Sequence, residues 1–192
     1  MIRKLIREQA LKQATRLFWK HGYNGTSMAM LTKELGVEKP SIYAEFGNKR
    51  SLFLEALLYY RTNMVAQVSR LFAAKASPRA GIEQVVRFMM MSLYEPEMQD
   101  GCLISNAALE LADHDAEVAQ HVATMLAEVT AAFERAILEA QQQGEVNSKV
   151  SAAVLASFLV NTIQGTRIVE KTRPDKDAQN AMVDFVLKTL DT

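Results

Sequence analysis

The side chains with the clearest binding chemistry stand close together in the first quarter of the chain. Lys39, Ser41 and Tyr43 supply an ammonium group, a hydroxyl and a phenol within one short segment. Ile42 and Phe46 are four residues apart and share the inner face of a predicted helix, so the polar side chains lie on its outer face. Such hydrogen-bond donors suit phosphate oxygens and base edges, and they do not form a nucleophile–base pair.

Two short helices separated by a glycine are predicted to position these side chains. Ser27 suits the cap of the first helix, in which Leu31 and Leu35 share an apolar face. Gly36 ends that helix, because glycine adopts the left-handed conformation at little cost. Pro40 suits the first turn of the second helix. This order predicts a helix-turn-helix, a unit whose second helix enters the major groove of DNA.

This segment resembles the N-terminal domain of TetR-type (tetracycline-repressor-like) transcriptional regulators. The resemblance is carried by Thr26-Ser27, Leu31, Leu35-Gly36-Val37, Lys39, Ser41-Ile42-Tyr43, Phe46, Lys49 and Leu52. It covers roughly the first third of the chain. A short later patch, Gly101-Cys102-Leu103 with Asn106 and Glu110, resembles a signature found in part of the family. The resemblance implies a homodimeric DNA-binding regulator, expected to be a repressor that a small hydrophobic ligand releases from its operator.

The resemblance also implies which residues contact double-stranded DNA. Thr26 and Ser27 are expected near one phosphate. Lys49 is expected near another, at the start of a helix that Asn48 can cap and whose free N–H groups favour an anion. The reading helix is expected to contribute Lys39, Pro40, Ser41, Tyr43 and Ala44. Of these, Tyr43 positions the protein, whereas base reading is expected from Lys39, Ser41 and Ala44.

The reading helix also departs from the family pattern. Glu38 stands where the family usually has a small hydroxyl residue, and its charge repels phosphate. Ala44-Glu45 replaces the common histidine or aromatic residues. For that reason the operator sequence cannot be inferred from relatives.

Charge is distributed unevenly, although Lys+Arg and Asp+Glu both total 22. Residues 1–50 hold ten basic and four acidic side chains, so they carry +6 and the remainder −6. This asymmetry is typical of a protein that binds a polyanion with one end. The single cysteine excludes an internal disulfide and favours a reducing compartment, so a cytoplasmic protein is predicted. The charged N-terminus and the short apolar runs predict neither a signal peptide nor a membrane span.

Enzyme signatures are missing from the sequence, so no catalytic residue, cofactor or metal is predicted. There is no Gly-x-Ser-x-Gly elbow, phosphate-binding glycine loop or dinucleotide fingerprint. His114, Glu117 and His121 can share a helical face, but helix capping and solvation explain the first two, which stand at a helix start in a charged stretch. Two alternatives remain open: a helical enzyme with an accessory DNA-binding head, and an architectural DNA binder without an effector.

Helical periodicity predicts an all-α fold of about nine helices. The predicted helices span residues 3–21, 28–35, 40–46, 49–75, 78–93, 103–111, 116–143, 149–171 and 175–190, with Ser148 as the cap of the eighth. No glycine or proline interrupts the long fourth helix. This helix therefore connects the DNA-binding segment to the rest of the chain without a flexible linker. We therefore predict a DNA-binding domain at residues 1–47 and an effector-binding and dimerisation domain at residues 48–192.

The second domain holds the predicted ligand and dimer residues. Methionines and a few polar groups suit an adaptable apolar pocket. The candidate ligand residues are Tyr60, Met64, Met90, Tyr94, Cys102, Asn106, Glu110, Met125 and Gln164. The last two helices are apolar on two sides, which predicts a dimer interface containing Phe158, Leu159, Thr162 and Phe185. Gly165 within the eighth helix predicts a close backbone approach. An alternative effector mechanism is reaction of the Cys102 thiol with an oxidant or electrophile.

Overall fold

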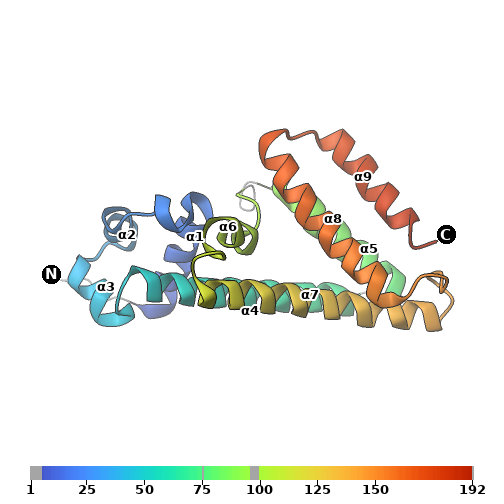
Figure 1. The fold of residues 1–192 in the computed structure, drawn as a ribbon, viewed down its shortest axis with the longest axis horizontal. Coiled ribbons are helices and arrows are strands. Elements are labelled where there is room, and N and C mark those ends of the chain that lie inside the picture. Colours follow the sequence, from blue (N-terminus) through green and yellow to red (C-terminus); the bar gives the residue numbers. More distant parts are fainter. Residues whose placement is uncertain (1–5, 75, 96–99, 192) are drawn as a thin grey trace. The chain divides into compact units, whose positions relative to one another are not determined.

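The computed structural model describes residues 6–74, 76–95 and 100–191. Within these residues the chain forms nine α-helices and one 3-10 helix, with no strand, as the periodicity predicts (Figure 1). The helices are α1 Arg7–Gly25, α2 Met28–Leu35, α3 Lys39–Phe46, α4 Lys49–Ala73, α5 Pro78–Met91, η1 Ser92–Tyr94, α6 Leu103–Leu111, α7 Ala116–Gln142, α8 Ala152–Thr172 and α9 Lys176–Lys188. The predicted start of the first helix at residue 3, the end of the fourth at residue 75 and most of the 95–101 loop lie outside the described residues.

Side-chain caps fix several of these helix ends. The Ser27 hydroxyl accepts a hydrogen bond from the Met30 N–H, and Asn48 Oδ1 accepts one from the Ser51 N–H at 2.9 Å, so both predicted caps are confirmed. The predicted cap Ser148 is wrong. Ser151 caps α8 instead, because its hydroxyl reaches the Val154 N–H. Two of these three predicted caps therefore hold, and the eighth helix starts three residues later than predicted.

The chain folds into two compact units. Unit 1 comprises residues 1–63 and 102–123, and unit 2 comprises residues 64–101 and 124–192. Helices α4 and α7 each contribute to both units. Within unit 1, α1 packs on α2 and α6, and α2 packs on α3. Within unit 2, α5 packs on α8 and α9.

Aromatic side chains form much of the core of unit 1. The Phe18 ring of α1 meets the Phe53 ring of α4 edge to face, with centroids 5.0 Å apart. Trp19 and Tyr60 meet in the same way at 5.0 Å. Edge-to-face pairs fix the orientation of both rings, so they hold α1 in register with the first turns of α4. The helix-turn-helix therefore rests on a packed support.

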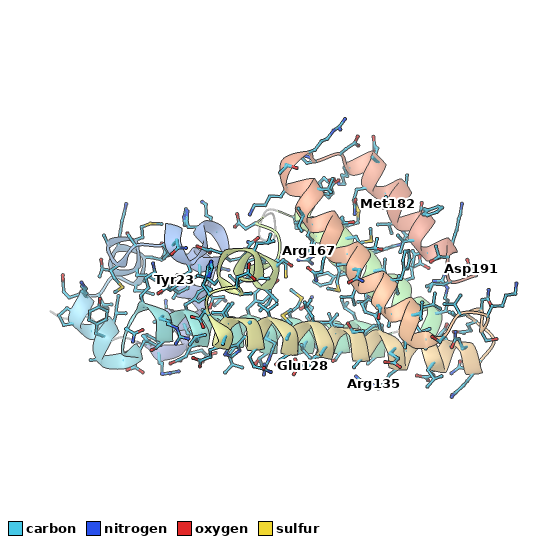
Figure 2. All side chains as sticks on the ribbon, viewed as in Figure 1. Tyr23, Glu128, Arg135, Arg167, Met182 and Asp191 are labelled. Atoms are coloured by element: carbon cyan, nitrogen blue, oxygen red, sulfur yellow. The ribbon has the colours of Figure 1, made fainter. Side chains whose placement is uncertain are left out.

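The core of unit 2 includes a buried arginine on the inner face of α8. Arg167, which is labelled in Figure 2, is 3% exposed. Its guanidinium donates hydrogen bonds to the carbonyls of Met89 and Gly101. Met89 belongs to the last turn of α5, where free carbonyl groups carry partial negative charge. Arg167 thus ties α8 to the end of α5 and to Gly101. By length and composition α8 is also able to cross a membrane, but one such helix is weak evidence of a span.

Candidate nucleic-acid interface

The turn between α2 and α3 is held by buried apolar side chains and one glycine. Gly36 has φ 64°, the left-handed conformation predicted for this position. Leu31 and Ile42 are fully buried, and Phe46 is nearly so. Because the inner residues of both helices are fixed in the core, α3 presents its other face to solvent.

That outer face contains the side chains predicted to read DNA. Lys39, Pro40, Tyr43 and Ala44 are exposed, and Ser41 is half-buried. The Lys39 ammonium lies 5.2 Å from the centre of the Tyr43 ring, so one cation and one phenol stand side by side. An exposed helix with adjacent donors and a small apolar residue fits a major groove.

Three other predicted DNA contacts occupy more restricted positions. Thr26 is fully buried, and its hydroxyl donates to the Gly22 carbonyl at 2.6 Å. Its side chain therefore positions the start of α2. Ser27 is exposed but caps α2. The Lys49 ammonium lies 4.3 Å above the Tyr23 ring. Burial lowers the pKa of Lys49, while the Glu110 carboxylate acts in the opposite direction.

An ion pair that spacing alone did not predict lies beside α3. Arg7 Nε lies 2.9 Å from the Glu45 carboxylate, and Arg7 Nη2 lies 2.5 Å from that of Glu55. The same guanidinium sits 5.2 Å from the centre of the Phe46 ring. The charge of Arg7 is thus compensated within the protein, and so is that of Glu45.

Two groups of contacts join α6 and the start of α7 to the helix-turn-helix support. The Glu110 carboxylate accepts hydrogen bonds from the backbone N–H groups of Tyr23, at 2.8 Å, and Asn24, at 2.6 Å. Arg50 donates to both oxygens of Asp115, at 2.7 and 2.8 Å, and to Glu117 at 3.0 Å. The Arg50 guanidinium lowers the pKa of the Asp115 carboxyl to about 2.

Comparisons with known proteins agree with this geometry over most of the chain. Residues 10–56 match the family described as bacterial regulatory proteins, tetR family. Residues 78–185 match the tetracyclin repressor-like C-terminal domain. The chain belongs to the TetR family. It is a DNA-binding transcriptional regulator, with α2 and α3 as its helix-turn-helix.

Individual proteins resemble the chain over most of its length. The uncharacterised HTH-type transcriptional regulator YezE of Bacillus subtilis (strain 168) is 31% identical over 182 residues, which is 94% of each chain. The HTH-type transcriptional repressor ComR of Escherichia coli (strain K12) is 29% identical, over 84% of this chain and 78% of its own. A cysteine mutant of the TetR family regulator CifR, solved with 26-base-pair operator DNA, is 27% identical with a TM-score of 0.86 and 98% coverage of both chains.

The predicted ligand residues are divided between the two units. In unit 1, Tyr60 and Cys102 are buried, with the Tyr60 hydroxyl 3.7 Å from the Cys102 sulfur. The Asn106 amide donates to the Trp19 carbonyl at 3.4 Å. Together with Glu110, these residues make contacts within the protein that hold unit 1 together.

The remaining predicted ligand residues belong to unit 2. Met64, Met90 and Met125 are buried, and Gln164 is half-buried. Tyr94 donates a very short hydrogen bond to Glu170. Burial and this bond together raise the pKa of Tyr94 to about 12.

An open pocket of about 540 Å³ lies within unit 2, where the end of α4 meets α5. It is lined by Leu71, Ala80, Glu83, Gln84, Arg87 and Phe88. None of the predicted ligand residues lines it. Sequence periodicity does not identify this pocket, because its lining residues belong to two different helices, α4 and α5. Among the described residues, no cluster of histidine, cysteine or acidic side chains is arranged to hold a metal ion.

The outer faces of α8 and α9 carry exposed apolar side chains. Phe158 is 38% exposed and Phe185 is 64% exposed. Thr162 is half-buried, whereas Leu159 is fully buried on the inner face of α8 and cannot contribute side-chain area to a partner. The rest of this outer face includes Val154, Ile168, Val169 and Met182.

Proposed function

We propose that the protein is a homodimeric repressor that presents one α3 helix to each half of a two-fold symmetric operator. The observation that carries the proposal is the exposed apolar face of α8 and α9, here called the α8/α9 face, formed by Val154, Phe158, Ile168, Met182 and Phe185. Burial of apolar surface is favourable by about 25 cal/mol per Å². In a two-fold dimer the same face of each copy covers the other, which suits a self-complementary apolar stripe.

Gly165 supports the same arrangement. It is exposed on α8, and a methyl group added at its Cα would meet no atom of the described residues within 4 Å beyond the neighbouring backbone of α8 itself. No contact among the described residues requires glycine here, although glycine in a helix costs about 1 kcal/mol relative to alanine. A second copy whose backbone approaches α8 closely accounts for it.

The dimer is tested by charge substitution on the α8/α9 face. Phe158→Glu and Phe185→Glu are expected to give folded monomers by light scattering, with affinity for a two-half-site operator greatly reduced. Asn180→Glu, an exposed change on α9 away from the apolar stripe, is the matched control and should remain dimeric. Dimers that persist in both phenylalanine variants, while the variants stay folded, would contradict the proposed interface.

We further propose that a small, largely apolar molecule releases the repressor from DNA. The pocket near α4 and α5 has a volume of about 540 Å³, within the usual range for small-molecule sites, roughly 300–1,000 Å³. Leu71 and Phe88 provide apolar lining and Gln84 a polar group. A ligand that binds one conformation of the effector-binding domain more tightly than another shifts the protein population toward that conformation. The shift would change the spacing of the two α3 helices in the dimer.

Noncovalent binding is favoured over reaction at Cys102. Cys102 is 4% exposed, and buried cysteines are usually inert. Wild type and Cys102→Ser are therefore expected to release DNA equally, or not at all, after mild peroxide. Release that occurs only in the wild type would instead support a thiol sensor.

The proposed function includes no catalytic step. The residues of α3, of the α8/α9 face and of the pocket act only by binding DNA, a second copy and a ligand, respectively. A cytoplasmic location fits this function, since the operator DNA must be reached and a single cysteine cannot form a disulfide within the chain.

A further inference from the structure

The N-terminal end of the recognition helix carries a carboxylate that no cation among the described residues compensates. Glu38 is the N-cap residue of α3, with φ −74° and ψ 153°. A side chain at this position often accepts a hydrogen bond from the first turn, but that of Glu38 does not. It is exposed, and it forms no hydrogen bond or ion pair with any of the described residues. The carboxylate is therefore available to a partner.

The other glutamate at α3 is in the opposite situation. Glu45 lies near the C-terminal end of the helix, and Arg7 Nε stands 2.9 Å from its carboxylate. Its charge is thus compensated by a cation of the same protein. The carboxylate without such a cation is therefore the one at the N-terminal end of α3. This is the end at which a recognition helix contacts base edges.

The chemistry of the major groove limits what Glu38 can contact favourably. Phosphates repel a carboxylate, and guanine and thymine present acceptor oxygens. Cytosine presents an isolated N4 amino donor, whereas the adenine N6 amino group lies beside the N7 acceptor. A carboxylate at this end of α3 is therefore attracted to cytosine and repelled by guanine and thymine.

We propose that Glu38 determines operator specificity by accepting a hydrogen bond from the N4 amino group of one cytosine in each half-site. The inference rests on DNA reading by α3, and it does not depend on the dimer. A monomer bound to one half-site would make the same contact.

The experiment begins with selection of duplexes from a random library by the wild-type protein. Dissociation constants are then measured at one salt concentration for duplexes carrying each of the four base pairs at every half-site position. The wild type should prefer cytosine at one position by about fivefold or more.

Glu38→Ala should lose that preference alone, while its affinity for other bases stays equal or rises because a negative charge is removed. Glu38→Gln should shift the preference to adenine, which a glutamine side chain contacts through N6 and N7.

Glu45→Ala is the matched control. It removes a carboxylate from the same helix, but one whose charge Arg7 already compensates. Its base preferences should equal those of the wild type. All of these changes are at exposed positions, and melting curves establish that the variants are folded. The proposal would be overturned if Glu38→Ala changed affinity for all sequences equally. It would also be overturned if the position that Glu38→Ala relaxes were one where the wild type prefers another base.

Discussion

At the scale of single residues, Glu110 is the side chain whose contacts say most about its role. Its carboxylate accepts hydrogen bonds from the N–H groups of Tyr23 and Asn24, next to Gly22, whose φ of 71° breaks the helical path of α1. Glu110→Ala leaves both donors without this acceptor, so the free energy of unfolding should fall by about 1–2 kcal/mol in urea denaturation.

Asp113→Ala is the control for Glu110→Ala, because Asp113 is an exposed acid three residues further along the chain. Its effect should stay within about 0.5 kcal/mol, as for most surface substitutions. Equal unfolding free energies for Glu110→Ala and Asp113→Ala would mean that the Glu110 contact adds nothing to stability.

The Asp115 carboxyl should make stability depend on pH. Its pKa is lowered from 3.8 to about 2, first by the hydrogen bonds from Arg50, so the folded protein holds this proton more weakly than the unfolded chain. The stabilisation is fully present above about pH 4 and is lost as the pH falls toward 2. Urea denaturation of wild type and Asp115→Asn should differ most at pH 5, and the difference should shrink as the pH falls from 4 toward 2. A difference that stays constant over this range would argue against the assignment.

The sequence predicted local contacts better than distant ones. Ser27 and Asn48 could be assigned as caps because each bonds an N–H three residues ahead. Glu110 was predicted to bind a ligand, yet its carboxylate contacts backbone groups 86 and 87 residues earlier in the chain. Spacing along a helix contains no information about such a partner. The pairing of Arg7 with Glu45 was missed for the same reason.

At the scale of elements, the exposed face of α3 should determine how DNA affinity depends on salt. The Lys39 ammonium and the Tyr43 phenol lie together on that face. A lysine that neutralises one phosphate contributes about 0.9 to the slope of log K against log salt concentration. Lys39→Ala removes one cation from the face that meets DNA, so it should weaken binding and reduce the slope by up to about that amount. Tyr43→Phe, which removes only a neutral hydroxyl, should weaken binding to all sequences with little change in slope.

Lys33→Ala provides the comparison for these two variants, since Lys33 is exposed in the last turn of α2. It removes the same charge outside α3 and should alter affinity less. An effect of Lys33→Ala as large as that of Lys39→Ala would mean that net charge alone, rather than the α3 face, determines binding.

Helix positions were largely predictable, but helix faces were less so. Apolar periodicity gave the nine α-helices of the described chain to within a few residues at most ends. It did not separate the inner from the outer face of α8, because both are apolar. Leu159 consequently appeared in the predicted interface although it is fully buried in its own protomer. Only packing against α5 distinguishes the two faces.

At the scale of the whole molecule, charge and apolar surface are separated along the chain. Residues 1–50 carry the positive excess and contain α2 and α3. The exposed apolar side chains of α8 and α9 lie in the last fifth of the sequence. A basic end suits DNA, and an apolar face suits a second copy. The sequence composition was enough to predict that basic charge and exposed apolar surface lie in different parts of the chain. That residues 102–123 belong to unit 1 could be seen only in the folded structure.

The most direct measurement of the proposed function is the sequence of the DNA that the wild-type protein selects from a random duplex library. Two α3 helices related by a two-fold axis read two half-sites of opposite orientation, about one helical turn or a multiple of it apart. The selected duplexes should therefore contain an inverted repeat with a fixed spacing. Enrichment of a single half-site, of direct repeats or of no sequence would contradict a symmetric dimer that reads DNA with α3.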